Sequence, residues 1–312
     1  MRILVVGAGA LGGYFGGRLK EAGRDVTFLV RPRRAEQLAK TGLVVKSPKG
    51  DIAIAAPPTV LAENLSAPFD LILLSCKAYD LQGAMESFAP AVGANTAILP
   101  LLNGMKHMDL LAARFGAGAV LGGQCIISVT LDGEGRILHL NDLHFLSFGE
   151  QNGAKSPRVA AIAAAFSGAK FDSQLSPAIL QEMWEKWAFI AAAAGICCLM
   201  RGAFGDIAAG GGSQYASDLF AECCAVAAKN GFAPGDTAVK RSLGMLTAAG
   251  SPIAASMLRD IERGARIESD HIVGDLLARG GGQDYPLLQI AYAHLRTYEA
   301  RRQREQAAAP KH

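Results

Sequence analysis

The N-terminal stretch of the chain restricts the folds open to it more than any other feature. Residues 2–6 (RILVV) form an apolar run suited to a buried strand, and a helical pattern reaching Leu19 begins shortly after it. Between them lies G-x-G-x-x-G, which in this position is typical of a dinucleotide-binding turn rather than of a merely structural glycine-rich turn. The spacing assigns Gly7 to the tight turn, Gly9 to close approach of a pyrophosphate and Gly12 to helix-on-strand packing. We therefore expect a pyrophosphate to lie at this loop and at the positive N-terminal end of the helix, held by Gly7, Ala8, Gly9, Ala10, Leu11 and Gly12.

Length and composition exclude several classes of protein. The 312 residues suit one large or two ordinary domains, and with 50% apolar and 19% charged residues a sizeable core is available. A net charge of +3 without long basic blocks argues against a nucleic-acid partner. No uninterrupted apolar run reaches the roughly 18 residues of a membrane span, and the start reads as a strand rather than a signal peptide. We therefore expect a cytoplasmic protein without a membrane partner.

Six cysteines are present, four of them in the vicinal pairs Cys197–Cys198 and Cys223–Cys224. Adjacent residues of a helix point to different faces, so a disulfide within either pair is not expected. The sequence has no cysteine and histidine spacing of a zinc site, and we expect no metal. The cysteines are interpreted as small, buried, apolar residues in a reducing compartment.

The second predicted strand, residues 25–31 (DVTFLVR), bears on the form of the cofactor. In a dinucleotide fold the end of this strand faces the adenine ribose, where an acidic residue would bind the 2′-hydroxyl. Here the strand ends at Arg31, with Arg33 and Arg34 just beyond it. A guanidinium can bind a 2′-phosphate through two hydrogen bonds, so the pattern favours NADP(H) over NAD(H). The alternative is that the arginines form a solvated helix start.

Two near-continuous apolar runs, residues 69–75 and 96–102, predict central parallel strands. Lys77 follows the first run and Asn103 follows the second. Ligands of α/β sheets bind at the carboxyl ends of parallel strands, so both residues are site candidates. The alternative is that they only cap the next helix.

The pattern then changes from strands to helices. Residues 42–54 read as a hairpin, and short strands at 125–130, 135–140 and 144–149 are expected to extend the parallel sheet. From Pro177 the pattern is helical almost to the end. We expect an α/β fold, with an N-terminal Rossmann-type, NADP-binding domain over residues 1–170 and an all-helical substrate and dimerisation domain over residues 171–312.

A lysine on the first helix of the second domain is the candidate acid. A bound nicotinamide implies hydride transfer, and reduction of a carbonyl needs a proton for the developing alkoxide. Lys186 lies between Trp184 and Trp187, and its helix face continues through Ile190 and Ala194. Desolvation on such a face would lower the pKa of the ammonium and suit it to general acid catalysis. Alternatively the side chain extends along the apolar face to solvent, or pairs with the glutamate one turn earlier.

Taken together, these residues resemble the ketopantoate reductase (2-dehydropantoate 2-reductase, ApbA/PanE) family over essentially the whole chain. GAGALGGYFGGRL, the lysine of SCKAYD, NG of LLNGM, WEK, and SM-x-x-D followed by E-x-D occur in the family's order and approximate spacing. The resemblance implies a Rossmann domain plus a helical domain. It places Arg31 on the 2′-phosphate and Lys77 and Asn103 beside the nicotinamide and substrate. It also makes Lys186 the general acid and has Ser256 and Glu268 bind the substrate's hydroxyl and carboxylate ends.

The sequence departs from the family on the helix that carries Lys186. The family pattern has asparagines four and eight residues after the lysine, where this chain has Ile190 and Ala194. Trp187 replaces the usual leucine, and we expect its ring to narrow or reshape the pocket. The predicted function is therefore NADPH-dependent reduction of a 2-oxo acid, with ketopantoate the most economical substrate. Alternatives are a less polar carbonyl or imine substrate, or an NADP(H)-binding sensor without catalysis. The Ala- and Gly-rich helices of the second domain suit either a homodimer surface or the core of a monomer.

Overall fold

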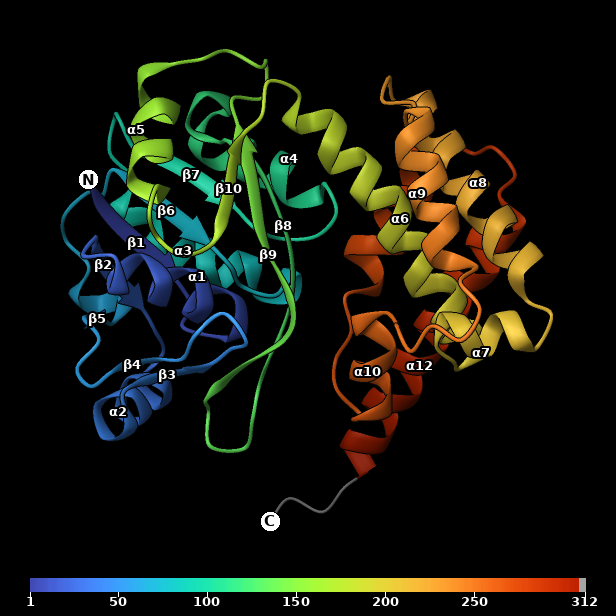
Figure 1. Ribbon diagram of the computed structural model, residues 1–312, viewed down its shortest axis with the longest axis horizontal. Coiled ribbons are helices and arrows are strands. Elements are labelled where there is room, and N and C mark those ends of the chain that lie inside the picture. The colour runs from blue at the N-terminus through green and yellow to red at the C-terminus, as the bar shows by residue number, and fades with distance from the viewer. Residues whose placement is uncertain (309–312) are drawn as a thin grey trace. The chain divides into compact units, whose positions relative to one another are not determined.

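The computed structural model describes residues 1–308, and within them the chain divides into two compact units (Figure 1). The first unit comprises Met1–Leu102 and His107–Leu180, and the second comprises Asn103–Lys106 and the chain from Gln181 onward. The division therefore lies later than the predicted boundary at residue 170. The reason is that residues 172–175 form a strand that pairs within the first unit, which keeps the following segment with it. The short segment that begins at Asn103 joins the second unit through tertiary contacts that sequence reading could not supply.

The first unit contains the predicted parallel sheet, in the order β5-β2-β1-β6-β7. Its strands are β1 (Arg2–Val6), β2 (Asp25–Leu29), β5 (Thr59–Val60), β6 (Leu71–Leu74) and β7 (Ala97–Pro100), and all neighbours are parallel. After β1 the chain forms β2 on one side of β1, and it later forms β6 on the other side of β1. This reversal brings the loops after β1 and β6 to the same edge, which is where such sheets bind ligands.

A second sheet in the first unit has the order β10-β9-β3-β4, with β8 also paired to β9. Its strands are β3 (Leu43–Lys46), β4 (Ile52–Ile54), β8 (Gly122–Leu131), β9 (Ile137–Gly149) and β10 (Asp172–Leu175). The predicted hairpin is confirmed, because β3 and β4 are antiparallel. The prediction that strands at 125–149 extend the parallel sheet is wrong. They form β8 and a single long β9, whose pairing with β8 is interrupted at residues 140–143, which lie opposite Ser128 alone. At this bulge in β9 the Asn141 side chain accepts a hydrogen bond (3.1 Å) from the backbone N–H of Ser128.

Helix α1 (Ala10–Glu21) packs against both sheets of the first unit through its glycines. A Cβ at Gly13 would lie 2.4 Å from Ile137 in β9, and one at Gly16 would lie 2.6 Å from Phe28 in β2. The remaining helices and helical turns of this unit are α2 (Pro32–Thr41), η1 (Ala62–Asn64), η2 (Ala78–Asp80), α3 (Leu81–Phe88), η3 (Ala89–Ala91), α4 (Lys106–Phe115), η4 (Ala117–Ala119) and α5 (Pro157–Phe166).

The second unit is helical, as predicted, and is drawn from olive to red in Figure 1. Its elements are α6 (Ile179–Met200), α7 (Phe204–Ala209), α8 (Ser213–Lys229), α9 (Asp236–Leu246), α10 (Ser256–Glu262), the π-helix η5 (Asp270–Gly274), α11 (Asp275–Arg279) and α12 (Pro286–Ala308). By length and composition α6 could cross a membrane, but 67% of its most apolar window is buried, as in a core helix. Within residues 1–308 none of the six cysteines forms a disulfide; Cys125, Cys197, Cys198 and Cys223 are buried, as predicted, whereas Cys76 and Cys224 are half-buried.

Candidate functional site

The glycine loop of the first unit has the geometry that its spacing predicts. The chain turns at Gly7, whose φ of +92° lies in the left-handed region that favours glycine. A Cβ at Gly12 would lie 2.1 Å from the Ser75 hydroxyl oxygen and 2.2 Å from the Gly7 carbonyl oxygen. Gly12 is therefore required for the close packing of α1 on the loop and on the end of β6.

The other side of the loop is open, as a bound pyrophosphate requires. A Cβ at Gly9 would have none of the described heavy atoms within 4 Å, apart from those of adjoining residues. Gly9 is the N-cap of α1, and within residues 1–308 no side chain caps this helix and no acidic residue lies in its first turn. Backbone N–H groups and the positive end of the helix dipole thus face a space that an anion can enter. The loop fits a dinucleotide.

Two arginines after β2 lie in different surroundings. Arg31 is largely exposed, and its guanidinium donates to the Asp80 carboxylate (2.9 Å), which raises the pKa of Arg31. Arg34 is half-buried; its Nε donates to the carbonyl of Ala8 in the glycine loop (2.9 Å), and burial lowers its pKa. In the described chain the Nη2 of Arg34 is buried without a hydrogen-bond partner. Sequence reasoning left Arg34 undecided, because the contact with Ala8 depends on how α2 packs.

The two residues predicted at strand ends fall in different units. Lys77 is exposed and precedes η2, at the sheet edge that the glycine loop also occupies. Asn103 is half-buried and belongs to the second unit. A ring N–H of His271 in η5 donates to the backbone carbonyl of Asn103, and burial lowers the pKa of His271. His271 carries no sequence motif, and only the fold reveals this contact.

The helix of Lys186 is fixed to two other segments of the second unit. Lys186 and Ile190 are half-buried and Ala194 is buried, one turn apart on one face of α6. Further along, the thiol of Cys197 makes a hydrogen bond with the backbone of Ala255, which immediately precedes α10. One turn beyond Ala194, burial raises the pKa of Cys198 to about 12, as expected for an apolar environment.

Trp187 joins α6 to the second segment, η5. Its indole N–H donates to the carbonyl of Ile272 (2.8 Å), and the side chain is 0% exposed. Trp187 is thus a core residue that holds η5. That its ring narrows or reshapes the substrate pocket stays a prediction.

The predicted substrate residues Ser256 and Glu268 stand at the ends of helical segments. Ser256 is exposed and is the first residue of α10. Glu268 is half-buried and lies just before η5. The backbone leading to it is held by Glu299 of α12, whose carboxylate accepts a hydrogen bond from the N–H of Ile267 (2.7 Å). The structure thus brings the helix of Lys186 against the segments that carry both residues.

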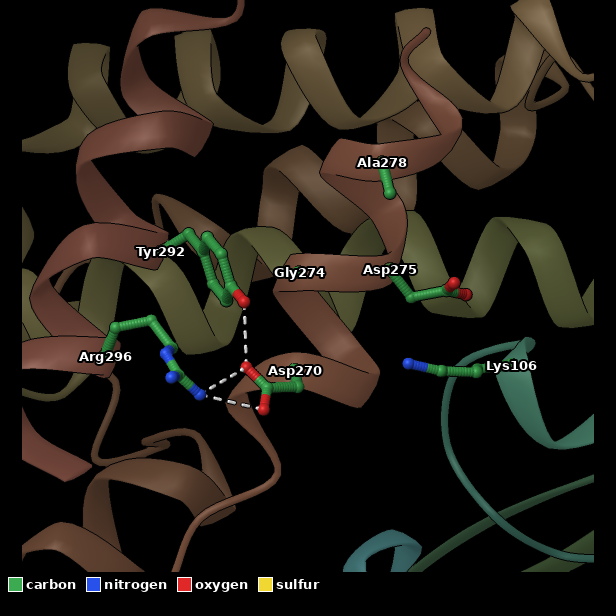
Figure 2. A pocket seen from close by; sticks show the side chains of 7 residues that line it. All are labelled: Lys106, Asp270, Gly274, Asp275, Ala278, Tyr292 and Arg296. Carbon is green, nitrogen blue, oxygen red and sulfur yellow. Dashed lines mark hydrogen bonds and ion pairs between the residues drawn. The ribbon is translucent and has the colours of Figure 1, made fainter. Parts of the chain in front are cut away.

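A cavity of about 390 Å³ lies within the second unit and is lined in part by η5, α11 and α12 (Figure 2). On one side of the cavity Asp270 accepts hydrogen bonds from the Tyr292 hydroxyl (2.8 Å) and from Arg296 (2.9 and 3.0 Å). Figure 2 shows Lys106 and Asp275 on the other side of the cavity. The cavity is lined by Lys106, Asp270, Gly274, Asp275, Ala278, Tyr292 and Arg296. The residues predicted for the site do not line this cavity. Over residues 1–308, no group of three or more His, Cys, Asp or Glu side chains is placed to hold a metal ion.

Comparison with known proteins assigns the family. The models of ketopantoate reductase PanE/ApbA and of its C-terminal domain match residues 3–153 and 178–299. The chain is 41% identical to the uncharacterized oxidoreductase YkpB of Bacillus subtilis, over 96% of this chain and 99% of the relative. It is 27% identical to a 2-dehydropantoate 2-reductase of Mesorhizobium japonicum, over 92% and 93%. The crystal structure of 2-dehydropantoate 2-reductase from Geobacter metallireducens is 30% identical and superimposes with a TM-score of 0.86, over 95% and 99%. The chain therefore belongs to the ketopantoate reductase family of NADP(H)-dependent oxidoreductases.

Proposed function

We propose that this protein reduces a 2-oxo acid to the 2-hydroxy acid with NADPH, and that its substrate is less polar than the family's name implies. The observation that carries the proposal is the face of α6. It keeps Lys186 half-buried but continues as Ile190 and Ala194, which have no hydrogen-bonding side-chain groups. Ketopantoate, the substrate in the family's name, serves as the reference substrate.

The preference for the phosphorylated cofactor is assigned to the arginines after β2. Arg31 is exposed and held by Asp80, and Arg34 lies against the carbonyl of Ala8 with one guanidinium nitrogen unused within residues 1–308. Two guanidinium groups near the adenosine end would favour a 2′-phosphate by charge-assisted hydrogen bonds. The loop from Gly7 to Gly12 and Lys77 hold the rest of the cofactor in this proposal.

The dinucleotide that the glycine loop and Lys77 would hold would supply the hydride for reduction of the substrate carbonyl. Lys186 gives a proton to the carbonyl oxygen as negative charge develops there, so that no free alkoxide forms. Asn103 orients the reacting carbonyl. Ser256 and Glu268 hold the two ends of the substrate, which limits its motion before transfer.

Substrate choice follows from the two apolar residues. If a polar substrate leaves hydroxyl or amide groups unpaired at Ile190 and Ala194, each lost hydrogen bond costs about 1–3 kcal/mol. A substrate with an aliphatic or aromatic side chain would lose no such bond and would bury apolar surface. YkpB, which is more similar to this chain than the Mesorhizobium reductase is, carries no substrate in its name.

The test is NADPH oxidation, followed by absorbance, with ketopantoate and with 2-oxo acids of increasing apolar size. We expect kcat/KM to be higher for an apolar 2-oxo acid than for ketopantoate. The variant Ile190→Asn/Ala194→Asn should shift the ratio toward ketopantoate by about 10-fold or more, since two hydrogen-bonding groups are restored. Because Ala194 is buried, the thermal midpoint of this variant is measured in parallel.

Each other outcome has a distinct meaning. Equal turnover of ketopantoate by both proteins would contradict the role assigned to Ile190 and Ala194. Turnover of an imine or of another carbonyl class would keep the fold and Lys186 but change the substrate. Tight NADPH binding without any turnover would indicate a sensor. A cytoplasmic location, a place in pantothenate biosynthesis and a homodimer stay predictions.

A further inference from the structure

Helix η5 (Asp270–Gly274) is held by three separate parts of the second unit. It is a π-helix, a form that is rare and often lies at functional sites. It begins two residues after Glu268, so its position sets where that carboxylate stands. The contacts of η5 reach the segment of Asn103, the helix of Lys186 and the helix α12.

The contact with the segment of Asn103 is made by His271. The ring of His271 donates to the Asn103 carbonyl, and the side chain is 6% exposed. The residue after Asn103, Gly104, has a φ of +82°, and a Cβ there would lie 2.8 Å from the His271 carbonyl oxygen and 3.1 Å from the ring carbon Cδ2. The backbone of Gly104 therefore packs closely against the backbone and the ring of His271. Burial lowers the pKa of His271, which favours the neutral ring, with one donating N–H.

The contact with α6 is made by the residue next to Lys186. The indole N–H of Trp187 donates to the carbonyl of Ile272, the residue after His271, and the indole is fully buried. A buried, satisfied hydrogen bond of this kind fixes η5 relative to α6, because breaking it would leave two buried polar groups unpaired.

The contact with α12 involves both ends of η5. Tyr292 and Arg296 both donate to the carboxylate of Asp270, as Figure 2 shows. A Cβ at Gly274 would lie 2.7 Å from the ring of Tyr292, so the far end of η5 lies tightly under the same aromatic ring. With both ends held on α12, η5 has little freedom to move, and His271 presents a fixed donor to Asn103.

We propose that His271 is a positioning residue for the reaction. Its hydrogen bond to the backbone carbonyl of Asn103 fixes the position of the Asn103 side chain relative to Lys186 and Glu268. The proposal rests on the proposed function, since it assigns work to Asn103 and Lys186 as site residues. His271 itself touches neither substrate nor cofactor in this scheme. It acts because η5, which follows Glu268 closely in the chain, contacts both the segment of Asn103 and the helix of Lys186.

The experiment compares His271→Phe, which keeps a ring without a donor, with His271→Gln, which keeps a side-chain N–H. His139→Phe is the matched control: His139 is also 6% exposed and hydrogen-bonded, to Ser47 and Leu143, but it lies in the first unit. We expect His271→Phe to lower kcat by about 10–100-fold with NADPH affinity changed less than about 3-fold, since misplacement by about 1 Å can cost that much. His271→Gln should recover most of the loss, and His139→Phe should leave kcat unchanged.

Hydrogen–deuterium exchange provides a readout that does not depend on turnover. In the full-length protein with NADPH, amides of residues 103–106 should exchange faster in His271→Phe than in the wild type, and not in His139→Phe. If the wild type turns over no 2-oxo acid, the proposed function has failed and exchange alone decides whether His271 holds Asn103. Unchanged exchange in His271→Phe, or unchanged kcat in an active enzyme, would overturn the proposal.

Discussion

The two units hold their predicted site residues in opposite ways. In the first, the cofactor loop is six consecutive residues between a strand and a helix, and its geometry follows from where glycine is sterically required. In the second, the predicted residues Asn103, Lys186, Ser256 and Glu268 come from separate segments, which are joined by contacts such as that of Trp187 with Ile272. A cofactor site can therefore be maintained by local rules. A substrate site changes whenever the packing of helices or one face of α6 changes.

The strongest test of this comparison is removal of the proposed acid. We expect Lys186→Ala to lower kcat by about 10²–10⁴-fold, the range associated with general acid catalysis, while NADPH affinity is retained because the glycine loop is intact. Steady-state kinetics and NADPH titration measure the two effects. Lys240→Ala, at an exposed position of α9, a helix that carries no predicted site residue, is the control and should be unaffected. Activity that survives Lys186→Ala would remove this lysine from the mechanism.

The arginines test whether the cofactor unit selects its ligand independently of the substrate unit. Arg31→Gln and Arg34→Gln should each reduce the preference for NADPH over NADH by about 10–100-fold, as loss of a charge-assisted hydrogen bond of about 1.5–3 kcal/mol implies. Affinities for both cofactors, measured by titration, give the ratio. Arg33→Gln, at an exposed neighbouring position, is the control. A ratio unchanged in both variants would assign the 2′-phosphate to other groups.

Substitutions at two glycines of the loop should affect different quantities, NADPH affinity at Gly9 and stability at Gly12. Gly9→Ala places a methyl in open space, so we expect the thermal midpoint to be unchanged but NADPH affinity to fall by about 10-fold, or 1.4 kcal/mol. Gly12→Ala instead forces a methyl to 2.1 Å from Ser75, and overpacking of this kind costs about 1–3 kcal/mol of stability. Calorimetry and titration check both. Equal loss of stability in the two variants would mean that the loop is not open at Gly9.

The smallest effect is the pH dependence of stability, to which both units contribute. Burial lowers the pKa of His144 in the first unit, although Asp172 opposes the shift. Because the unfolded chain has a histidine pKa of about 6.5, it binds more protons than the folded state between the folded value and 6.5. This contribution to stability is therefore present above about pH 6.5 and is lost as the pH falls below it. We expect the thermal midpoint to fall on acidification.

The variant His144→Asn should flatten that pH dependence in part, since His271 in the second unit contributes with the same sign. Asparagine keeps an acceptor for the Tyr14 hydroxyl, which bonds His144 Nδ1 at 2.8 Å. Thermal midpoints between pH 5.5 and 7.5 measure the difference. A wild-type midpoint that rises on acidification would contradict a lowered histidine pKa in the folded state.

Sequence patterns were sufficient for features with local causes. The strand–glycine–helix order of residues 2–21, the hairpin at 43–54 and the helical second unit follow from periodicity and turn chemistry, and the structure contains each of them. The family could also be named from the sequence, because its motifs occur in order along the whole chain. The site roles of Lys77, Asn103, Lys186, Ser256 and Glu268 stay predictions.

Only the tertiary structure decided the rest. In the structure two predicted strands form one strand, β9, and the first unit extends to Leu180. Asn103 belongs to the second unit, and Trp187 holds η5 through a hydrogen bond. The same is true of Arg34 against Ala8 and His271 against Asn103. The physical reason is common to all of these. Backbone preference and hydrophobic periodicity act between residues a few positions apart, whereas these contacts join side chains to carbonyls of distant segments, and no local pattern records which segments will meet.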